Sequence, residues 1–335
     1  MKRRLKSAIF FALYYTGVEW LLARLLPVNA VAVLMYHGVC DNAAIPPEIN
    51  FHLPGRIFDR QMRALRRRYR VVPLIDVVNR LDRGEGLEKA TVITFDDGYR
   101  NNGTQAAPVL ARLGLPYTVF VNTKYVGTSD WLPLNKIYWA WSERQIDSEQ
   151  MKELRKQVRS RPAAEFSRIL QELPPNRTSD LAKGEESFAM LDWVEAREMA
   201  RAGAHFASHT HSHCNMAAES KESQERELEI SRDLIEKNLP RQPALFAYPF
   251  GHLAEMSETA RASIIRSGFK AAISAEYGLV TPHSDRFCLP RLGYDVAIWN
   301  FTGEILYQFA KQSLKDAWSA VVGRRPRPDA TAETS

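Results

Sequence analysis

Short apolar runs alternate along the chain with longer segments whose apolar residues recur every three or four positions. The runs are rich in β-branched and aromatic residues, as buried strands are. They lie at Val31–Tyr36, Thr91–Phe95, Tyr117–Val121, Ala204–Ser208, Ala244–Ala247 and Ala271–Ser274. The helical segments include Asp59–Tyr69, Gln105–Leu113, Asp192–Arg201, Gln224–Lys237 and Glu255–Arg266. This alternation predicts an α/β fold, in which helices connect the parallel strands of a sheet or barrel.

One long segment interrupts the alternation. Residues 123–188 carry several Trp and Tyr side chains around a charged helical middle, which predicts an insertion over the rim of a domain that spans residues 30–322. Ile137, Tyr138 and Trp141 have helical spacing, which favours packing within the insertion over aromatic faces offered to a sugar ring. Residues 323–335 are rich in Arg, Pro and Ala and are expected to be disordered.

Residues 1–29 carry a membrane signal. The basic segment Lys2–Lys6 precedes an apolar run, Ala8–Val18, that is too short to span a bilayer. This composition favours a helix on the membrane surface, so we expect a membrane-associated protein, peripheral or N-terminally anchored, on a side of the membrane left open. Its anchoring residues would be Phe10, Phe11, Tyr14, Tyr15 and Trp20. An uncleaved anchor and a signal peptide cleaved at Val28–Ala30 remain alternatives.

Composition narrows the class of protein. With 335 residues, 45% hydrophobic and 25% charged, the chain can form one sizeable α/β barrel or two small domains. The net charge of +6 is modest, and the basic run Arg63–Arg70 has the spacing of a solvated helix face, so no nucleic-acid binding is expected. Three cysteines without C-x-x-C spacing indicate neither a disulfide framework nor a thiolate zinc site.

Polar side chains follow the ends of several predicted strands. Asp96 and Asp97 follow one run directly, and a histidine cluster at residues 208–213 follows another. Because the carboxyl ends of barrel strands share one rim, these groups are expected to meet. One carboxylate and two imidazoles can hold a divalent ion with open positions, and a second carboxylate can then act as a base. A plain turn at Asp96–Asp97 is the alternative.

The spacing of the histidines leaves two arrangements open. If the strand continued through the cluster, His209, His211 and His213 would share a face and form a three-histidine site. A helical turn would instead bring only His209 and His213 together. The choice decides which imidazoles face Asp97.

Three motifs resemble the first three motifs of the polysaccharide deacetylases, carbohydrate esterase family four of the NodB-homology type. They are Thr94–Tyr99, Ser208–His213 and Phe246–Gly251, and the resemblance covers about Val31–Tyr294. It implies a distorted (β/α) barrel that removes N-acetyl groups from an amino sugar with the help of a metal. Zinc is the expected ion, with cobalt, nickel or manganese as alternatives.

The same resemblance implies roles for individual residues. Asp96 would be the general base, and Asp97, His209 and His213 would bind the metal, which leaves His211 outside the ligand set. The backbone N–H of Tyr99 would help to stabilise the oxyanion, and Tyr248 of the third motif would contact or orient the substrate.

Two departures from the usual family pattern matter. Many members carry a Leu-x-x-His motif near the C-terminus, but here the pattern is Leu34–His37, at the first strand. This order resembles a permuted branch similar to poly-N-acetylglucosamine deacetylases and implies that His37 is the general acid, with a core histidine as the alternative. The third motif lacks its arginine, and Arg291 is the predicted substitute partner of Asp96, with a surface salt bridge as the alternative.

The predicted function is hydrolytic de-N-acetylation of an N-acetylated sugar, polymeric or lipid-linked. Two alternatives stay open, a catalytically silent glycan-binding barrel and an amidase for a non-sugar amide. The silent barrel is disfavoured because binding alone requires no base such as Asp96.

Overall fold

The sheet of the computed structural model is built from parallel strands and nearly closes on itself. The structure describes residues 2–41, 52–171, 173, 187–239, 242 and 244–322. The strands follow the order β1-β5-β6-β7-β8-β9-β10, with a short β4 (Arg70–Val71) beside β5. Their bounds are β1 (Val31–Tyr36), β5 (Ala90–Phe95), β6 (Tyr117–Val121), β7 (Ala204–Ser208), β8 (Leu245–Ala247), β9 (Ala271–Tyr277) and β10 (Leu289–Arg291).

The first and last strands of this order meet. Leu292 follows β10, and its N–H donates a hydrogen bond of 2.8 Å to the carbonyl of Val33, while the N–H of Met35 donates one of 2.9 Å to the carbonyl of Leu292. The sheet therefore forms a distorted (β/α) barrel, as the sequence predicted. A separate two-stranded ladder, β2 (Gly38–Val39) with β3 (His52–Leu53), follows β1.

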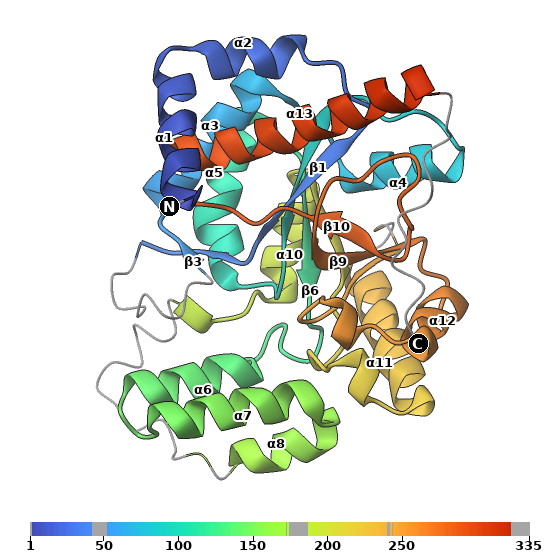
Figure 1. The fold of residues 1–335 in the computed structure, drawn as a ribbon. Coiled ribbons are helices and arrows are strands. Elements are labelled where there is room, and N and C mark those ends of the chain that lie inside the picture. Colours follow the sequence, from blue (N-terminus) through green and yellow to red (C-terminus); the bar gives the residue numbers. More distant parts are fainter. Residues whose placement is uncertain are drawn as a thin grey trace.

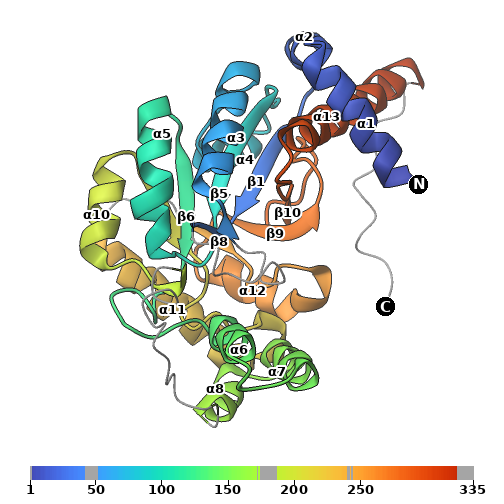
Figure 2. The same ribbon diagram turned by 90° about the vertical axis from the view of Figure 1, so that its left-hand side faces the viewer.

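Helices surround the barrel (Figures 1 and 2). They are α3 (Gly55–Arg68), α4 (Leu74–Asp82), α5 (Ala107–Leu113), α10 (Trp193–Arg201), α11 (Lys221–Asn238) and α12 (Glu258–Arg266). The two helices α11 and α12 begin away from the predicted starts because serine caps set the boundaries. Ser220 accepts a hydrogen bond from the N–H of Ser223, and Ser257 accepts one from the N–H of Ala260.

The insertion after β6 forms its own helical layer below the carboxyl ends of the strands (Figure 1). It contains α6 (Pro133–Ser142), α7 (Ser148–Ser160) and α8 (Ala163–Gln171). Ile137, Tyr138, Met151 and Phe166 are buried together in a core of the insertion, which agrees with the packing interpretation. The predicted helical insertion is therefore present, and α6 also reaches the rim of the barrel.

Two N-terminal helices pack on the barrel. These are α1 (Lys2–Tyr15) and α2 (Val18–Leu25), and both contact the long C-terminal helix α13 (Ile298–Val322). Phe10 is buried against Gly303, and the buried carboxylate of Glu19 pairs with Arg68 at 2.6 Å. The expectation that Phe10 faces a membrane is therefore wrong, because this ring fills a contact between α1 and α13.

Other large apolar side chains of α1, α2 and α13 are exposed, and we call this set of residues the apolar end. It comprises Leu5, Ile9, Phe11, Tyr15, Val18, Trp20, Leu21, Leu22 and Leu25 of α1 and α2, with Tyr307, Leu314 and Trp318 of α13. In the described part of the chain no single helix is long and apolar enough to cross a membrane, although α1 and α2, bent by 87°, pass that test as a pair. The predicted disordered tail, 323–335, lies outside the described residues.

Both ribbon views place α1, α2 and α13 at one end of the molecule and α6, α7 and α8 at the other (Figures 1 and 2). The carboxyl ends of the strands face the insertion. The apolar end and the rim that carries the polar motifs are thus on opposite ends of the barrel.

Candidate active site

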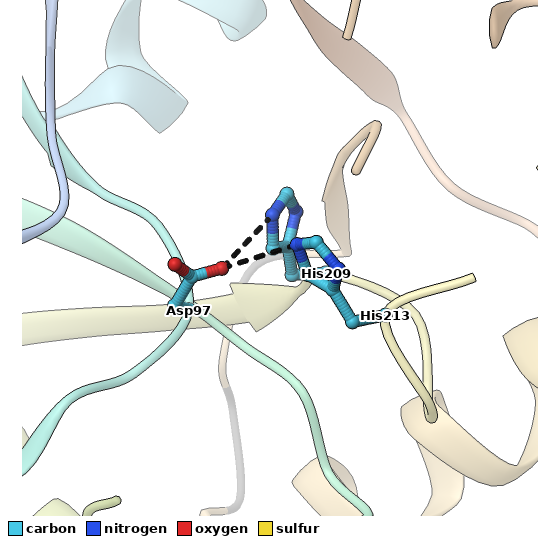
Figure 3. A group of neighbouring side chains, drawn as sticks. All are labelled: Asp97, His209 and His213. Carbon is cyan, nitrogen blue, oxygen red and sulfur yellow. Dashed lines mark ion pairs between the residues drawn. The ribbon is translucent and has the colours of Figure 1, made fainter. Parts of the chain in front are cut away.

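Three side chains from two strand ends converge in the barrel mouth. Asp97 Oδ1 lies 3.6 Å from His209 Nε2 and 3.3 Å from His213 Nε2 (Figure 3). All three residues are buried, and their candidate ligand atoms lie within 4.8 Å of one another. Asp97, His209 and His213 are the three predicted metal ligands, and the fold brings them together.

The backbone after β5 turns sharply to aim Asp97 inward. Asp97 has φ of 74° and Gly98 has φ of 78°, a left-handed conformation that glycine adopts without strain and aspartate tolerates better than most residues. A Cβ at position 98 would also lie 2.8 Å from Val121 Cγ1. Glycine is therefore required where the loop passes close to β6.

A tight turn after β7 decides the arrangement of the histidines. Thr210 and His213 have positive φ, and Thr210 Oγ1 accepts a hydrogen bond of 2.9 Å from the N–H of His213. Glu227 of α11 accepts hydrogen bonds from the N–H groups of His211 and Ser212 at 2.9 and 2.8 Å. The strand does not continue through the cluster, so the three-histidine arrangement is excluded.

His211 points away from Asp97. Its Nδ1 lies 2.9 Å from Thr123 Oγ1, and its ring is only partly buried. Glu227, which fixes this turn, was not identified from the sequence. A carboxylate on a helix face carries no motif, and its role depends on which loop packs above it.

The triad fits a divalent metal ion. His209 Nδ1 lies 2.8 Å from the carbonyl of Ala247, so that nitrogen carries the proton and the lone pair of Nε2 faces Asp97. Burial lowers the pKa of His209 to about 4, which keeps the imidazole neutral, as a metal ligand must be. Burial opposes ionisation of Asp97, but His213 and the neighbouring imidazoles lower its pKa well below the usual range. The site thus offers the ionised carboxylate of Asp97 and the neutral imidazole of His209, with His213 Nε2 facing the same carboxylate oxygen.

Asp96 is held by Arg291. The guanidinium donates two parallel hydrogen bonds, Nη1 to Oδ1 at 2.7 Å and Nη2 to Oδ2 at 2.8 Å, and its Nε donates to the carbonyl of Ser274 at 2.7 Å. Both side chains are buried, so the alternative of a surface salt bridge is wrong. Burial raises the pKa of Asp96, but the charge and hydrogen bonds of Arg291, together with the neighbouring imidazoles of His209 and His37, outweigh it, and the net pKa is lowered.

One pocket of about 220 Å³ joins the eight residues singled out from the sequence. Its lining includes His37, Asp96, Asp97, Tyr99, His209, His213, Tyr248 and Arg291. The insertion closes one side with Leu132, Leu134, Asn135, Tyr138 and Arg159, and Phe250 lies at the end of the third motif. The pocket is therefore shared between the barrel and the insertion. The sequence placed the insertion over the rim and left aromatic contact with a sugar ring as an alternative, but it did not assign Leu132, Asn135 or Arg159 to the pocket.

The two tyrosines of the motifs are anchored by their hydroxyl groups. Tyr99 Oη lies 3.1 Å from Asn135 Oδ1, and the Tyr248 hydroxyl donates to the carbonyl of Phe287 at 3.2 Å. Burial raises the pKa of both phenols above the ordinary value, so both stay neutral. They form rigid aromatic walls beside the triad.

His37 is positioned by a π-helical turn, η1 (Asn102–Ala106), that precedes α5. Asn102 Nδ2 donates to the carbonyl of His37 at 2.7 Å, and the N–H of Val39 donates to Asn101 Oδ1 at 3.0 Å. A regular helix was predicted from Gln105, so this turn is a correction. At the start of this turn, two consecutive asparagines bind backbone groups of His37 and Val39. Turns of this kind are frequent at functional sites.

A second histidine lies under the pocket wall. His52 is buried against Tyr99, with ring centroids 4.8 Å apart, and burial lowers its pKa to about 4. Its sequence context carries no motif, so it was not singled out. A neutral ring at this place supports Tyr99 by packing.

Comparisons with known proteins agree with this geometry. A family model described as polysaccharide deacetylase matches residues 83–272. A Bacillus subtilis protein named as a polysaccharide deacetylase, YxkH, is 22% identical over 262 residues, which cover 78% of this chain and 70% of that protein. The poly-beta-1,6-N-acetyl-D-glucosamine N-deacetylase of Staphylococcus aureus is 31% identical over 121 residues, 32% of this chain and 41% of the enzyme's own length.

The structure of IcaB from Ammonifex degensii has the same fold. It superimposes with a TM-score of 0.58 at 18% identity and covers 83% of this chain and 97% of the other. At this identity the likeness concerns the barrel fold.

Proposed function

Because this chain belongs to the polysaccharide deacetylase family, we propose that it removes N-acetyl groups from an amino sugar in a polysaccharide or lipid-linked glycan. The observation that carries this proposal is the pairing of two adjacent carboxylates with different partners. Asp97 faces two imidazoles, whereas Asp96 is bound to Arg291 and stays outside the triad. A site for glycan binding alone requires no such second carboxylate.

The residues of the pocket divide the chemistry between them. Asp97, His209 and His213 would hold a divalent ion, which supplies a Lewis acid for water and for the acetamide carbonyl. Asp96, kept ionised and oriented by Arg291, takes a proton from the attacking water. His37 gives a proton to the departing nitrogen, and the N–H of Tyr99 donates to the oxygen that gains negative charge.

Zinc is the metal that we propose, with cobalt, nickel or manganese as alternatives. A small set of nitrogen and carboxylate donors with open positions suits zinc catalysis. Removing the metal with a chelator should abolish acetate release, and adding back single metals should show which ion restores the highest rate.

The direct test is acetate release from N-acetylglucosamine oligosaccharides. Turnover of the oligosaccharides but not of simple acetamides would support the deacetylase, and the reverse would indicate an amidase for a non-sugar substrate. Tight oligosaccharide binding by the metal-loaded protein without acetate release would indicate a silent glycan-binding barrel.

Loss of His37 should separate substrates by their leaving groups. His37→Ala is expected to lower turnover of the acetamide by about 10²-fold or more, because an amine is a poor leaving group unless it is protonated. An activated aryl acetate needs little protonation, so its hydrolysis should fall much less. The measurement is kcat for both substrates on protein with equal metal content. Equal losses on both would assign His37 a structural role.

We also propose that the apolar end rests on a membrane surface. The sequence of α1 combines the basic segment Lys2–Lys6 with apolar residues whose side chains are exposed. Helices that lie at a membrane surface have this composition. Leu5→Glu with Ile9→Glu should reduce co-sedimentation with vesicles that contain anionic lipid. Val194→Glu with Ile265→Glu changes two exposed apolar residues outside the apolar end and should leave sedimentation unchanged. An equal effect of both pairs would contradict this orientation.

A further inference from the structure

Four cationic side chains share one face of α7. Lys152, Arg155, Lys156 and Arg159 have the i, i+3, i+4 and i+7 spacing that aligns side chains on a helix. They line a groove of about 580 Å³, and Glu255 contributes the single carboxylate among its lining residues. Four cations against one carboxylate make the groove strongly positive.

Neighbouring acids compensate this charge only in part. Glu149 lies 2.7 Å from Lys152, but both side chains are mostly exposed, so water screens the pair. Glu255 is 3.4 Å from Arg159 and also accepts a hydrogen bond from the N–H of His252. Within the described residues, Arg155 and Lys156 have no carboxylate partner.

The groove adjoins the catalytic pocket. Arg159 lines both cavities, and its guanidinium lies 5.0 Å from the ring centroid of Phe250. The guanidinium carbon of Arg155 lies 5.4 Å from the ring centroid of Tyr138. Both rings belong to the wall of the catalytic pocket. A glycan with one sugar at the triad can therefore continue over these rings into the groove.

The charge of the groove indicates the kind of ligand. A neutral N-acetylated sugar forms no ion pair with four cations, whereas an oxyanion accepts stronger, charge-assisted hydrogen bonds from a guanidinium fork and from ammonium groups. We propose that the substrate is an acidic polysaccharide, in which a carboxylate or phosphate next to the N-acetylated sugar binds in this groove. The inference rests on the proposed deacetylase activity and defines the class of glycan on which it acts.

The test compares acetate release from three substrates of similar length by the metal-loaded enzyme. These are a neutral N-acetylglucosamine oligosaccharide, one that alternates N-acetylglucosamine with glucuronate, and one whose N-acetylglucosamine units are joined by phosphodiesters. We expect a higher kcat/KM for one anionic substrate, and which of the two it is separates carboxylate from phosphate recognition. Raising the salt concentration should reduce this preference.

Substitutions inside and outside the groove should show whether its cations cause the preference for an anionic substrate. Lys152→Ala with Lys156→Ala should raise KM for the preferred anionic substrate about tenfold, with a smaller change in kcat, because two charge-assisted contacts are lost. Arg161→Ala with Arg168→Ala removes two cations from the same insertion outside the groove and should leave the preference intact. Equal effects of both pairs, or no preference for either anionic substrate in the unchanged enzyme, would overturn the proposal.

Failure of the deacetylase function itself would look different. If no substrate releases acetate, calorimetric titration with the anionic oligosaccharides still measures how tightly they bind to the groove. Binding that Lys152→Ala with Lys156→Ala weakens, and that the control pair does not, supports the acidic ligand. Absence of such binding overturns it.

Discussion

Asp97→Ala, His209→Ala and His213→Ala are each expected to abolish stoichiometric metal in the purified protein. Each removes one of the three proposed ligands, and two such ligands are not expected to hold the ion through purification. Metal content per chain, measured by elemental analysis, is the readout, with circular dichroism to confirm the fold.

The matched control is His211→Ala, which removes an imidazole from the same turn. Its ring bonds Thr123 and does not face Asp97, so metal content should stay close to that of the unchanged protein. Equal loss of metal in this variant would mean that three histidines bind the ion, contrary to the turn in the structure.

Asp96→Asn should separate turnover from metal binding. The amide keeps the shape of the carboxylate but cannot accept a proton, so kcat should fall on the order of 10²-fold or more while the metal remains bound. Steady-state rates and metal content are measured on the same preparation. Near-normal turnover would remove Asp96 from the role of base.

Arg291→Lys tests the role of Asp96 through the pH dependence of the rate. Arg291 lowers the pKa of Asp96, so losing its paired hydrogen bonds should raise that pKa. The base acts when ionised, and the rate should therefore decline at a higher pH as the solution is acidified. Lysine is chosen because it keeps the positive charge beside Asp96. Removing one partner of a buried ion pair completely would destabilise the fold by about 3–5 kcal/mol. If the rate of the variant declined at the same acidic pH as that of the unchanged enzyme, Arg291 would not orient Asp96.

The sequence predicted the barrel well because the signals of its strands are local. Apolar runs such as Tyr117–Val121 and Ala204–Ser208 have the bounds of β6 and β7. Asp97, His209 and His213 are also brought together as predicted, since parallel strands place their carboxyl ends on one rim. Their distances depend on two turns with positive φ, and no periodicity predicts such turns.

Helix α13 was not predicted, although its pattern is readable in retrospect. Ile298, Phe301, Ile305 and Phe309 recur at helical spacing and are buried. By contrast, Glu227 and Arg159 could not be assigned from the sequence. Each is an ordinary charged residue on a helix, and its contact with the site depends on how that helix packs.

The opposite placement of the apolar end and the catalytic mouth has a consequence for access. If α1 and α2 lie on a bilayer, the carboxyl ends of the strands, beside the insertion helices α6, α7 and α8, face away from it into the surrounding solvent (Figures 1 and 2). A sugar attached directly to a lipid of the same leaflet would remain near the wrong end of the enzyme. A long, flexible strand that projects from the surface could loop back to the opening, so chain length would then govern which sugars lose their acetyl groups.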